Sequence, residues 1–186
     1  MKQYEEMEQY CMECGAFKAK VIDTDRIPFD EELRKACEAN ICGHYGRNYA
    51  CPPNVGTPGE LIAEAKSYRK GLVFQTVTEI EDSYDIEGMM DAQNRHTEVA
   101  ESIEEMVRKH YEKFLRLEAG GCTRCKVCGQ ITGEPCRMPD KATASVEAYC
   151  MNCSQLAEVS GMKYINGVNT VTYFGMFLLP ATEIDF

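Results

Sequence analysis

The 186-residue chain has no tryptophan, only three histidines and little basic charge. Its 20 lysine and arginine residues face 30 acidic ones, so the formal net charge is -10 at pH 7. This charge repels a phosphate backbone and no lysine- or arginine-rich run offsets it, so we expect no nucleic-acid partner. The histidines form no recognisable triad or metalloprotease spacing, so the sequence assigns no enzymatic reaction.

Long apolar runs are also missing, and none reaches the roughly 18 residues that would span a bilayer. The opening stretch MKQYEEMEQYCMEC lacks the basic region and apolar core of a secretory signal. We therefore expect no membrane association and a cytoplasmic protein. Its 44% apolar and 27% charged residues are typical of a globular chain. The length predicts one metal-binding domain over residues 1-186, with a cysteine-rich insert at about 119-141.

Cysteine, in contrast, is abundant, with eleven residues. A reducing cytoplasm keeps thiols reduced, so an odd number of them indicates metal ligands or redox chemistry before structural disulfides.

Four cysteines fall within the segment AGGCTRCKVCGQITGEPCRMP, residues 119-139. They are Cys122, Cys125, Cys128 and Cys136. Spacings of three, three and eight residues let one loop direct all four sulfurs to one side, as a 4Fe-4S cluster requires, and the glycines between Cys128 and Cys136 allow the loop to turn back. Zinc is the alternative cofactor, although four-cysteine zinc sites usually consist of two separated C-x2-C pairs.

The same segment is locally basic, because Arg124, Lys126, Arg137 and Lys141 outnumber the acids around them. Positive charge would complement an anionic thiolate-bound cluster. Without the cysteines, these residues would indicate only a solvated loop.

A second group, Cys37, Cys42 and Cys51, surrounds a loop with four glycines and three prolines at residues 42-59. Three thiolates are one short of a closed site. Either a distant cysteine completes it, or the fourth position is open to substrate and the metal is reactive. The alternative is that these cysteines pack as small apolar residues. We do not count the nearby His44 among the ligands.

Two C-x2-C pairs remain, Cys11 with Cys14 and Cys150 with Cys153. Brought together, they would form a four-thiolate metal site. A redox-active dithiol and unpaired thiols are the alternatives.

The fold class predicted from the pattern of apolar and turn-forming residues is α/β (α+β), with a small sheet covered by helices in a layered sandwich. Strands are expected at residues 19-25, 72-80 and 169-179. Helices are expected after Pro28 with Asp30 as N-cap, from Pro58, over one long stretch ending at Gly120-Gly121, and over 145-161.

On that long helix, apolar residues at helical spacing include Val99, Phe114 and Leu117. The pattern places His96 on the surface and His110 in the core.

Several motifs together resemble a known family. They are Cys37 and Cys42 followed by CPPNVGTP at 51-58, the triple cysteine at 122-128, PCRMP at 135-139, SVEAY at 145-149 and NTVTYFGMFLL at 169-179. This combination resembles the predicted metal-binding protein family, domain of unknown function 2284, over nearly the whole chain. The resemblance implies a metal site with both cysteine groups as its characteristic residues, and no established reaction.

The chain departs from the family pattern at its two C-x2-C pairs. The pattern has glycine and an apolar residue at the positions of Cys150 and Cys153, and no pair at residues 11-14. A joint addition of four cysteines would be consistent with an extra shared metal.

These observations lead to three hypotheses. The first is an iron-sulfur protein that transfers single electrons to a redox partner protein. The second is a metal-dependent enzyme or enzyme accessory with an open site at Cys37, Cys42 and Cys51. The third is a zinc-stabilised interaction module.

Overall fold

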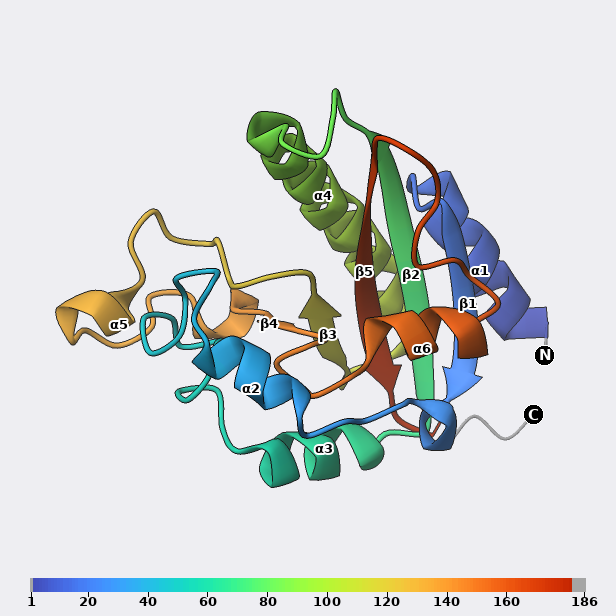
Figure 1. Ribbon diagram of the computed structural model, residues 1–186. Coiled ribbons are helices and arrows are strands. Elements are labelled where there is room, and N and C mark those ends of the chain that lie inside the picture. Colours follow the sequence, from blue (N-terminus) through green and yellow to red (C-terminus); the bar gives the residue numbers. More distant parts are fainter. Residues whose placement is uncertain (1, 182–186) are drawn as a thin grey trace.

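The computed structural model describes residues 2-181, which form a five-stranded mixed sheet between helices (Figure 1). The sheet order is β1-β2-β5-β3-β4, and only β3 and β4 run parallel. The strands are β1 (Lys18–Asp23), β2 (Lys70–Glu79), β3 (Leu115–Glu118), β4 (Ala144–Ser145) and β5 (Thr170–Leu179). The α+β fold class predicted from the sequence is confirmed.

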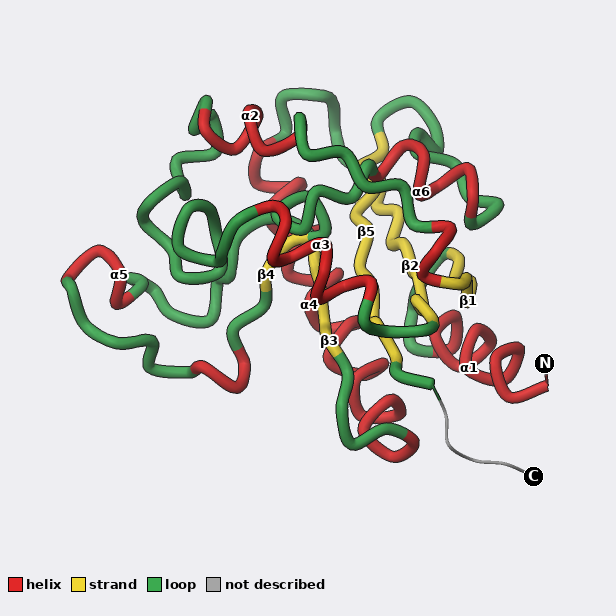
Figure 2. Tube along the Cα trace, turned by 90° about the horizontal axis from the view of Figure 1, so that it is seen from below, coloured by secondary structure: helices red, strands yellow, loops and turns green. Residues whose placement is uncertain are grey.

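Helices cover both faces of the sheet (Figures 1 and 2). They are α1 (Lys2–Glu13), α2 (Leu33–Glu38), α3 (Pro58–Lys66), α4 (Ile86–His110), α5 (Gly129–Thr132) and α6 (Cys153–Val159), with short 3-10 turns at Thr24–Arg26 and Pro139–Lys141. One apolar cluster joins α1 and α4 to the sheet, and a second joins α3 and α6 to the opposite face. Within the described residues, no helix is both long and apolar enough to cross a membrane.

Strand β2 shows why the sheet is covered on both sides. Leu72 and Phe74 belong to the cluster under α1 and α4, whereas Val73 belongs to the cluster under α3 and α6. Successive side chains of a strand point to opposite faces, so a continuous apolar run is buried on both. The strands predicted at 19-25, 72-80 and 169-179 are all present with ends shifted by two residues or fewer.

The start of α3 also agrees with the sequence. Thr57 is its N-cap and Pro58 its first residue. The side chains of Thr57 and Glu60 each accept a hydrogen bond from the other residue's backbone N–H group. This capping box fixes the end of the glycine-rich loop.

The predicted end of the long helix is wrong. Helix α4 ends at His110, and Leu117 lies in β3, where it pairs with Met176 of β5. The apolar spacing of Phe114 and Leu117 continued the helical pattern, but hydrogen bonding to β5 extends the chain there. Tertiary pairing therefore overrides local periodicity.

The placement of the two histidines is the reverse of the prediction. His96 is fully buried and stacks on Phe74 with ring centroids 5.1 Å apart, while His110 is exposed. The Nδ1 atom of His96 lies 2.8 Å from the Thr76 hydroxyl, which satisfies one polar atom of the ring. Its position is set by the sheet beneath α4, which the sequence pattern did not reveal.

Two predicted helix starts are also corrected. Asn152, not Ser145, caps α6, since its side chain accepts a hydrogen bond from the backbone N–H of Gln155. Ser145 lies in β4, and its hydroxyl accepts from Ala148 N in the following turn. In the same way Asp30 caps a turn ahead of α2, which begins later, at Leu33.

Glycine at position 175 is required by the packing around His96. A Cβ atom there would lie 2.3 Å from Phe74 Cζ and 3.1 Å from His96 Nε2. We predict that Gly175→Ala lowers the free energy of unfolding by about 1 to 3 kcal/mol through overpacking. Gly59→Ala is the control, since its Cβ meets nothing within 4 Å, and should change stability by less than about 1 kcal/mol. Urea unfolding measures both, and equal effects would contradict the packing argument.

Burial of His96 makes stability depend on pH. Burial, followed by the charge of Arg116, lowers the pKa of His96 from 6.5 to about 4. The unfolded chain therefore binds a proton first, and stability falls as the pH drops from about 6.5 towards 4. We expect this histidine to contribute about 2 kcal/mol of lost stability between pH 7 and pH 5. Urea unfolding of His96→Gln at both pH values should show a loss of stability between pH 7 and pH 5 that is smaller by that amount. A loss equal to that of the wild-type protein would contradict the assignment.

Candidate metal centre

The two cysteine-rich loops lie side by side at one end of the sheet, beyond β3 and β4 (Figures 1 and 2). Three hydrogen bonds join residues 48-54 to residues 122-134. They run from Asn48 Nδ2 to Cys122 O (2.9 Å), from Tyr49 Oη to Glu134 O (2.8 Å) and from Gln130 Nε2 to Asn54 Oδ1 (3.2 Å). The fold thus unites segments more than 70 residues apart.

Asn48 is the buried member of this junction, with 4% of its surface exposed. Its side-chain oxygen accepts a hydrogen bond from Ala50 N at 3.0 Å, while its amide nitrogen donates to Cys122. One side chain therefore shapes the turn before Cys51 and holds the start of the other cysteine loop.

The four cysteines predicted as cluster ligands line one small cavity. Asn48, Tyr49 and Ala50 form part of its wall, and the four thiols are those of Cys122, Cys125, Cys128 and Cys136. All four are free and partly exposed. The structure therefore places all four predicted ligands around one cavity near the surface.

Glycine lets this loop close on itself, as the sequence indicated. The backbone N–H of Glu134 donates to Gly129 O at 2.9 Å. A Cβ on Gly129 would lie 2.6 Å from the carbonyl oxygen of Glu134 and 2.7 Å from that of Pro135, distances that no side chain tolerates. Gly133 supplies the left-handed turn, with φ of 70°. Cys136 is thereby returned towards Cys128.

The second cysteine group lies directly against the first. A Cβ built on Gly121 would meet Cys51 Sγ at 3.1 Å, so Cys51 packs against the residue that precedes Cys122. Burial, followed by the nearby thiols of Cys42 and Cys37, raises the pKa of Cys51 to about 11. A metal that binds Cys51 would have to displace the proton of a thiol with a high pKa, so metal binding would weaken as the pH falls.

Cys150 is placed near this second group by Arg34. The buried guanidinium of Arg34 donates to Gly56 O at 3.2 Å and to Ala148 O at 3.1 Å, which ties α2 to both neighbouring loops. Burial raises the pKa of Cys37, and the Cys42 and Cys150 thiols add to that effect while Arg34 opposes it. Cys150 therefore lies close enough to Cys37 to influence its pKa.

The two C-x2-C pairs do not come together, so of the three alternatives that the sequence left open, the shared metal site is wrong. Cys11 and Cys14 lie in the apolar cluster under α1 and α4, and Cys153 lies in the cluster on the opposite face. The intervening sheet separates them. Their thiols are also poor nucleophiles, because burial raises the pKa of Cys11 to about 12 and, together with Glu147, raises the pKa of Cys153.

Among residues 2-181, no three cysteine, histidine or acidic side chains lie close enough to hold one metal ion. The four thiols can line one cavity and still lie too far apart to bind a single ion. A single zinc ion draws its sulfurs to about 2.3 Å from one centre, whereas a cubane cluster binds each thiolate to a different iron and spreads them apart.

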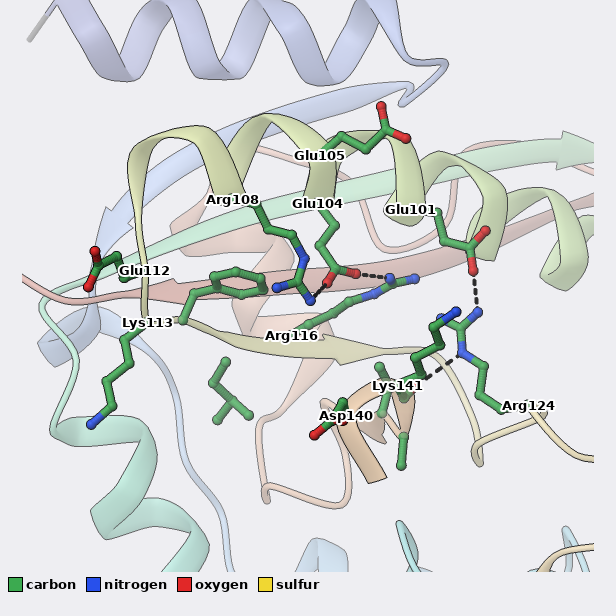
Figure 3. A pocket seen from close by; sticks show the side chains of 14 residues that line it. Glu101, Glu104, Glu105, Arg108, Glu112, Lys113, Arg116, Arg124, Asp140 and Lys141 are labelled. Atoms are coloured by element: carbon green, nitrogen blue, oxygen red, sulfur yellow. Dashed lines mark hydrogen bonds and ion pairs between the residues drawn. The ribbon is translucent and has the colours of Figure 1, made fainter. Parts of the chain in front are cut away.

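A charged pocket of about 580 Å³ adjoins the cysteine loop (Figure 3). Glu104 pairs with Arg108 and Arg116, and Glu101 pairs with Arg124. The sequence does not reveal this network, because its members come from α4, β3 and the cysteine loop.

Arg124 is the member of this network that belongs to the basic excess seen in the sequence. Its Nη2 atom also lies 3.4 Å from Glu118 Oε1, and its Nε donates a hydrogen bond to Lys141 O at 3.1 Å. Its charge is therefore largely balanced by acids, and it anchors the loop to α4 and β3.

These features define a cysteine-rich protein with seven thiols gathered at one end of an α+β sheet. The chain belongs to the predicted metal-binding protein family, domain of unknown function 2284, whose model matches residues 20-179. No curated protein and no solved structure matches it. The match includes both cysteine loops and excludes Cys11 and Cys14.

The junction at Asn48 can be tested by mutation. We predict that Asn48→Ala lowers the free energy of unfolding by about 2 to 3 kcal/mol, because the Ala50 N–H and Cys122 carbonyl lose their partners. Tyr49→Phe removes only an exposed hydrogen bond and should cost about 1 kcal/mol or less. Urea unfolding provides the comparison. If Asn48→Ala costs no more than Tyr49→Phe, Asn48 does not hold the two loops together.

Proposed function

We propose that the protein carries a 4Fe-4S cluster and transfers single electrons to a partner protein. The ligands would be Cys122, Cys125, Cys128 and Cys136. The observation that supports this most directly is that these four thiols line one cavity. The family description supports metal binding in general.

The choice of iron and sulfide over zinc is supported by the spacing of the thiols. Three of them follow one another at every third residue, and a single loop with two turning glycines supplies the fourth. Clusters are commonly bound by such closely spaced cysteines, while four-cysteine zinc sites usually use two separate pairs. When bound, the cluster would supply a one-electron redox centre.

The surroundings of the cysteines suit electron transfer better than hydrolysis. All four are partly exposed at one end of the molecule, so a partner can approach the centre closely. Arg137 pairs with Glu134, donates a hydrogen bond to Val127 O at 3.0 Å and lies near Cys125, where an N–H group would favour a reduced, more anionic cluster. We place this role in the cytoplasm, where a reducing poise keeps the ligands available.

A second candidate function concerns Cys37, Cys42 and Cys51. This proposal is supported by the influence of Cys42 and Cys37 on the pKa of Cys51, which places the three thiols near one another. A metal held there with one open position would make the protein a metal-dependent enzyme or an enzyme accessory. A zinc-stabilised interaction module is the remaining alternative for either group.

Anaerobic purification tests the proposed cofactor. We expect about four iron and four acid-labile sulfide ions per chain for one cluster, and an absorption band near about 400 nm that dithionite bleaches. Replacing any one of the four ligands with serine should remove most of the band. Cys14→Ser is the matched control and should retain it, because Cys14 packs against the apolar cluster under α1 and α4 and does not line the cavity of the four thiols. A colourless protein with stoichiometric zinc would contradict the proposal.

A further inference from the structure

Cys150 is a buried cysteine that neither the proposed cluster nor apolar packing accounts for. It is fully buried but belongs to neither apolar cluster, whereas Cys11 and Cys153 each belong to one. Its φ of 58° also lies in the left-handed region, which residues other than glycine rarely adopt. Packing as a small apolar residue therefore does not explain why a cysteine stands at this position.

Arg34 lies beside Cys150 and carries a buried charge. The residue is 7% exposed, and among the residues that the structure describes it forms no ion pair with a carboxylate. Its terminal nitrogens donate to the carbonyl oxygens of Gly56 and Ala148, and its Nε is buried without a hydrogen-bond partner in the described chain. A buried charge without an anionic partner is strongly unfavourable, so we expect an anion beside Arg34.

The nearby cysteines can supply that anion. Burial raises the pKa of Cys150, and the charge of Arg34 and a hydrogen bond from its side chain oppose that rise. Cys37 follows Arg34 by three residues on α2, so the two side chains lie on the same side of the helix. A free thiol is neutral, but a metal-bound cysteine is a thiolate. A metal centre at these cysteines would therefore provide the negative charge that Arg34 lacks.

The other thiols of the second group lie close to the same position. Cys42 and Cys37 are near enough to Cys51 to raise its pKa, and Cys150 has the same effect on Cys37. The backbone holds this arrangement, since Asp30 N donates to Cys150 O at 2.8 Å just ahead of α2. The start of the helix that carries Cys37 is thus fixed against the turn that carries Cys150.

We propose that these thiols bind a second 4Fe-4S cluster, with Arg34 beside it as the balancing positive charge. The ligands are Cys37, Cys42, Cys51 and Cys150. Thiolates spread around a cubane cluster agree with the finding that no three side chains among residues 2-181 lie close enough to hold a single ion. With Cys150 as the fourth ligand, this centre has no position open to a substrate. The proposal rests on the proposed function for the kind of cofactor, but it needs none of the first four ligands.

Replacement of Cys150 tests the fourth ligand. Glycine adopts a φ of 58° without strain and cannot bind iron, so Cys150→Gly removes the thiol and keeps the turn. In anaerobically purified protein, two clusters give about eight iron and eight acid-labile sulfide ions per chain. We expect Cys150→Gly and Cys37→Ala each to lose roughly one to four iron ions, since a cluster that lacks one ligand loses either a single iron or its whole core. Electron paramagnetic resonance of the oxidised protein detects a three-iron remainder.

Two further variants control for the fold. Cys150→Asn also tolerates the left-handed conformation and should lose the same iron as Cys150→Gly. Cys153→Ala is the matched control, because Cys153 belongs to the same C-x2-C pair but packs in the apolar cluster under α3 and α6, and it should keep the wild-type iron content. Wild-type iron, sulfide and resonance spectra in both Cys150 variants would overturn the proposal. Loss of iron in Cys37→Ala alone would overturn it too, and would leave an open site at the other three cysteines.

The same assay in a Cys125→Ala background separates this inference from the proposed function, because Cys125 belongs only to the first centre. Further loss of iron on adding Cys150→Gly to that background supports an independent second cluster. If iron depends on Cys125 and not on Cys150, the proposed function stands and this inference fails. If iron depends on Cys150 and not on Cys125, the inference stands and the proposed function fails. Wild-type protein without iron would overturn both.

Discussion

The position of β5 between β2 and β3 is the constraint on which the rest of the structure depends. This last strand pairs along its whole length with β2 and, over its final part, with β3. It therefore joins the antiparallel pair β1 and β2, from the first half of the chain, to the short strand β3 that precedes the cysteine loop. Because β3 continues almost directly into Cys122, the pairing decides where that loop leaves the sheet.

Around the assembled sheet, a few buried or partly buried polar side chains hold the loops in place. Asn48 links the two cysteine loops, Arg34 links α2 to the turn before Cys150, and Arg124 ties the cysteine loop to α4. Loops of this length have few apolar contacts of their own, so paired polar groups must hold them. The candidate centre is thus positioned by hydrogen bonds, while the sheet beneath it is stabilised by apolar packing.

Prediction from the sequence succeeded where the signal was local. The capping box at Thr57 and the long apolar strands were recognisable, because neighbouring residues alone decide them. It failed at Leu117, whose helical spacing is overridden by pairing with β5, and at His96, whose burial follows from Phe74 on a distant strand. Those outcomes depend on partners far away in the chain, which periodicity does not encode.

The same division holds for the metal centre. By itself the sequence determined that Cys122, Cys125, Cys128 and Cys136 belong to one glycine-turned loop, because their spacing limits how far apart the sulfurs can lie. Only the tertiary structure decided which of the other cysteines accompany them. It brings Cys51 to Gly121 through the Asn48 junction and leaves the two C-x2-C pairs on opposite faces of the sheet, because a covered sheet keeps apart whatever packs on its two sides.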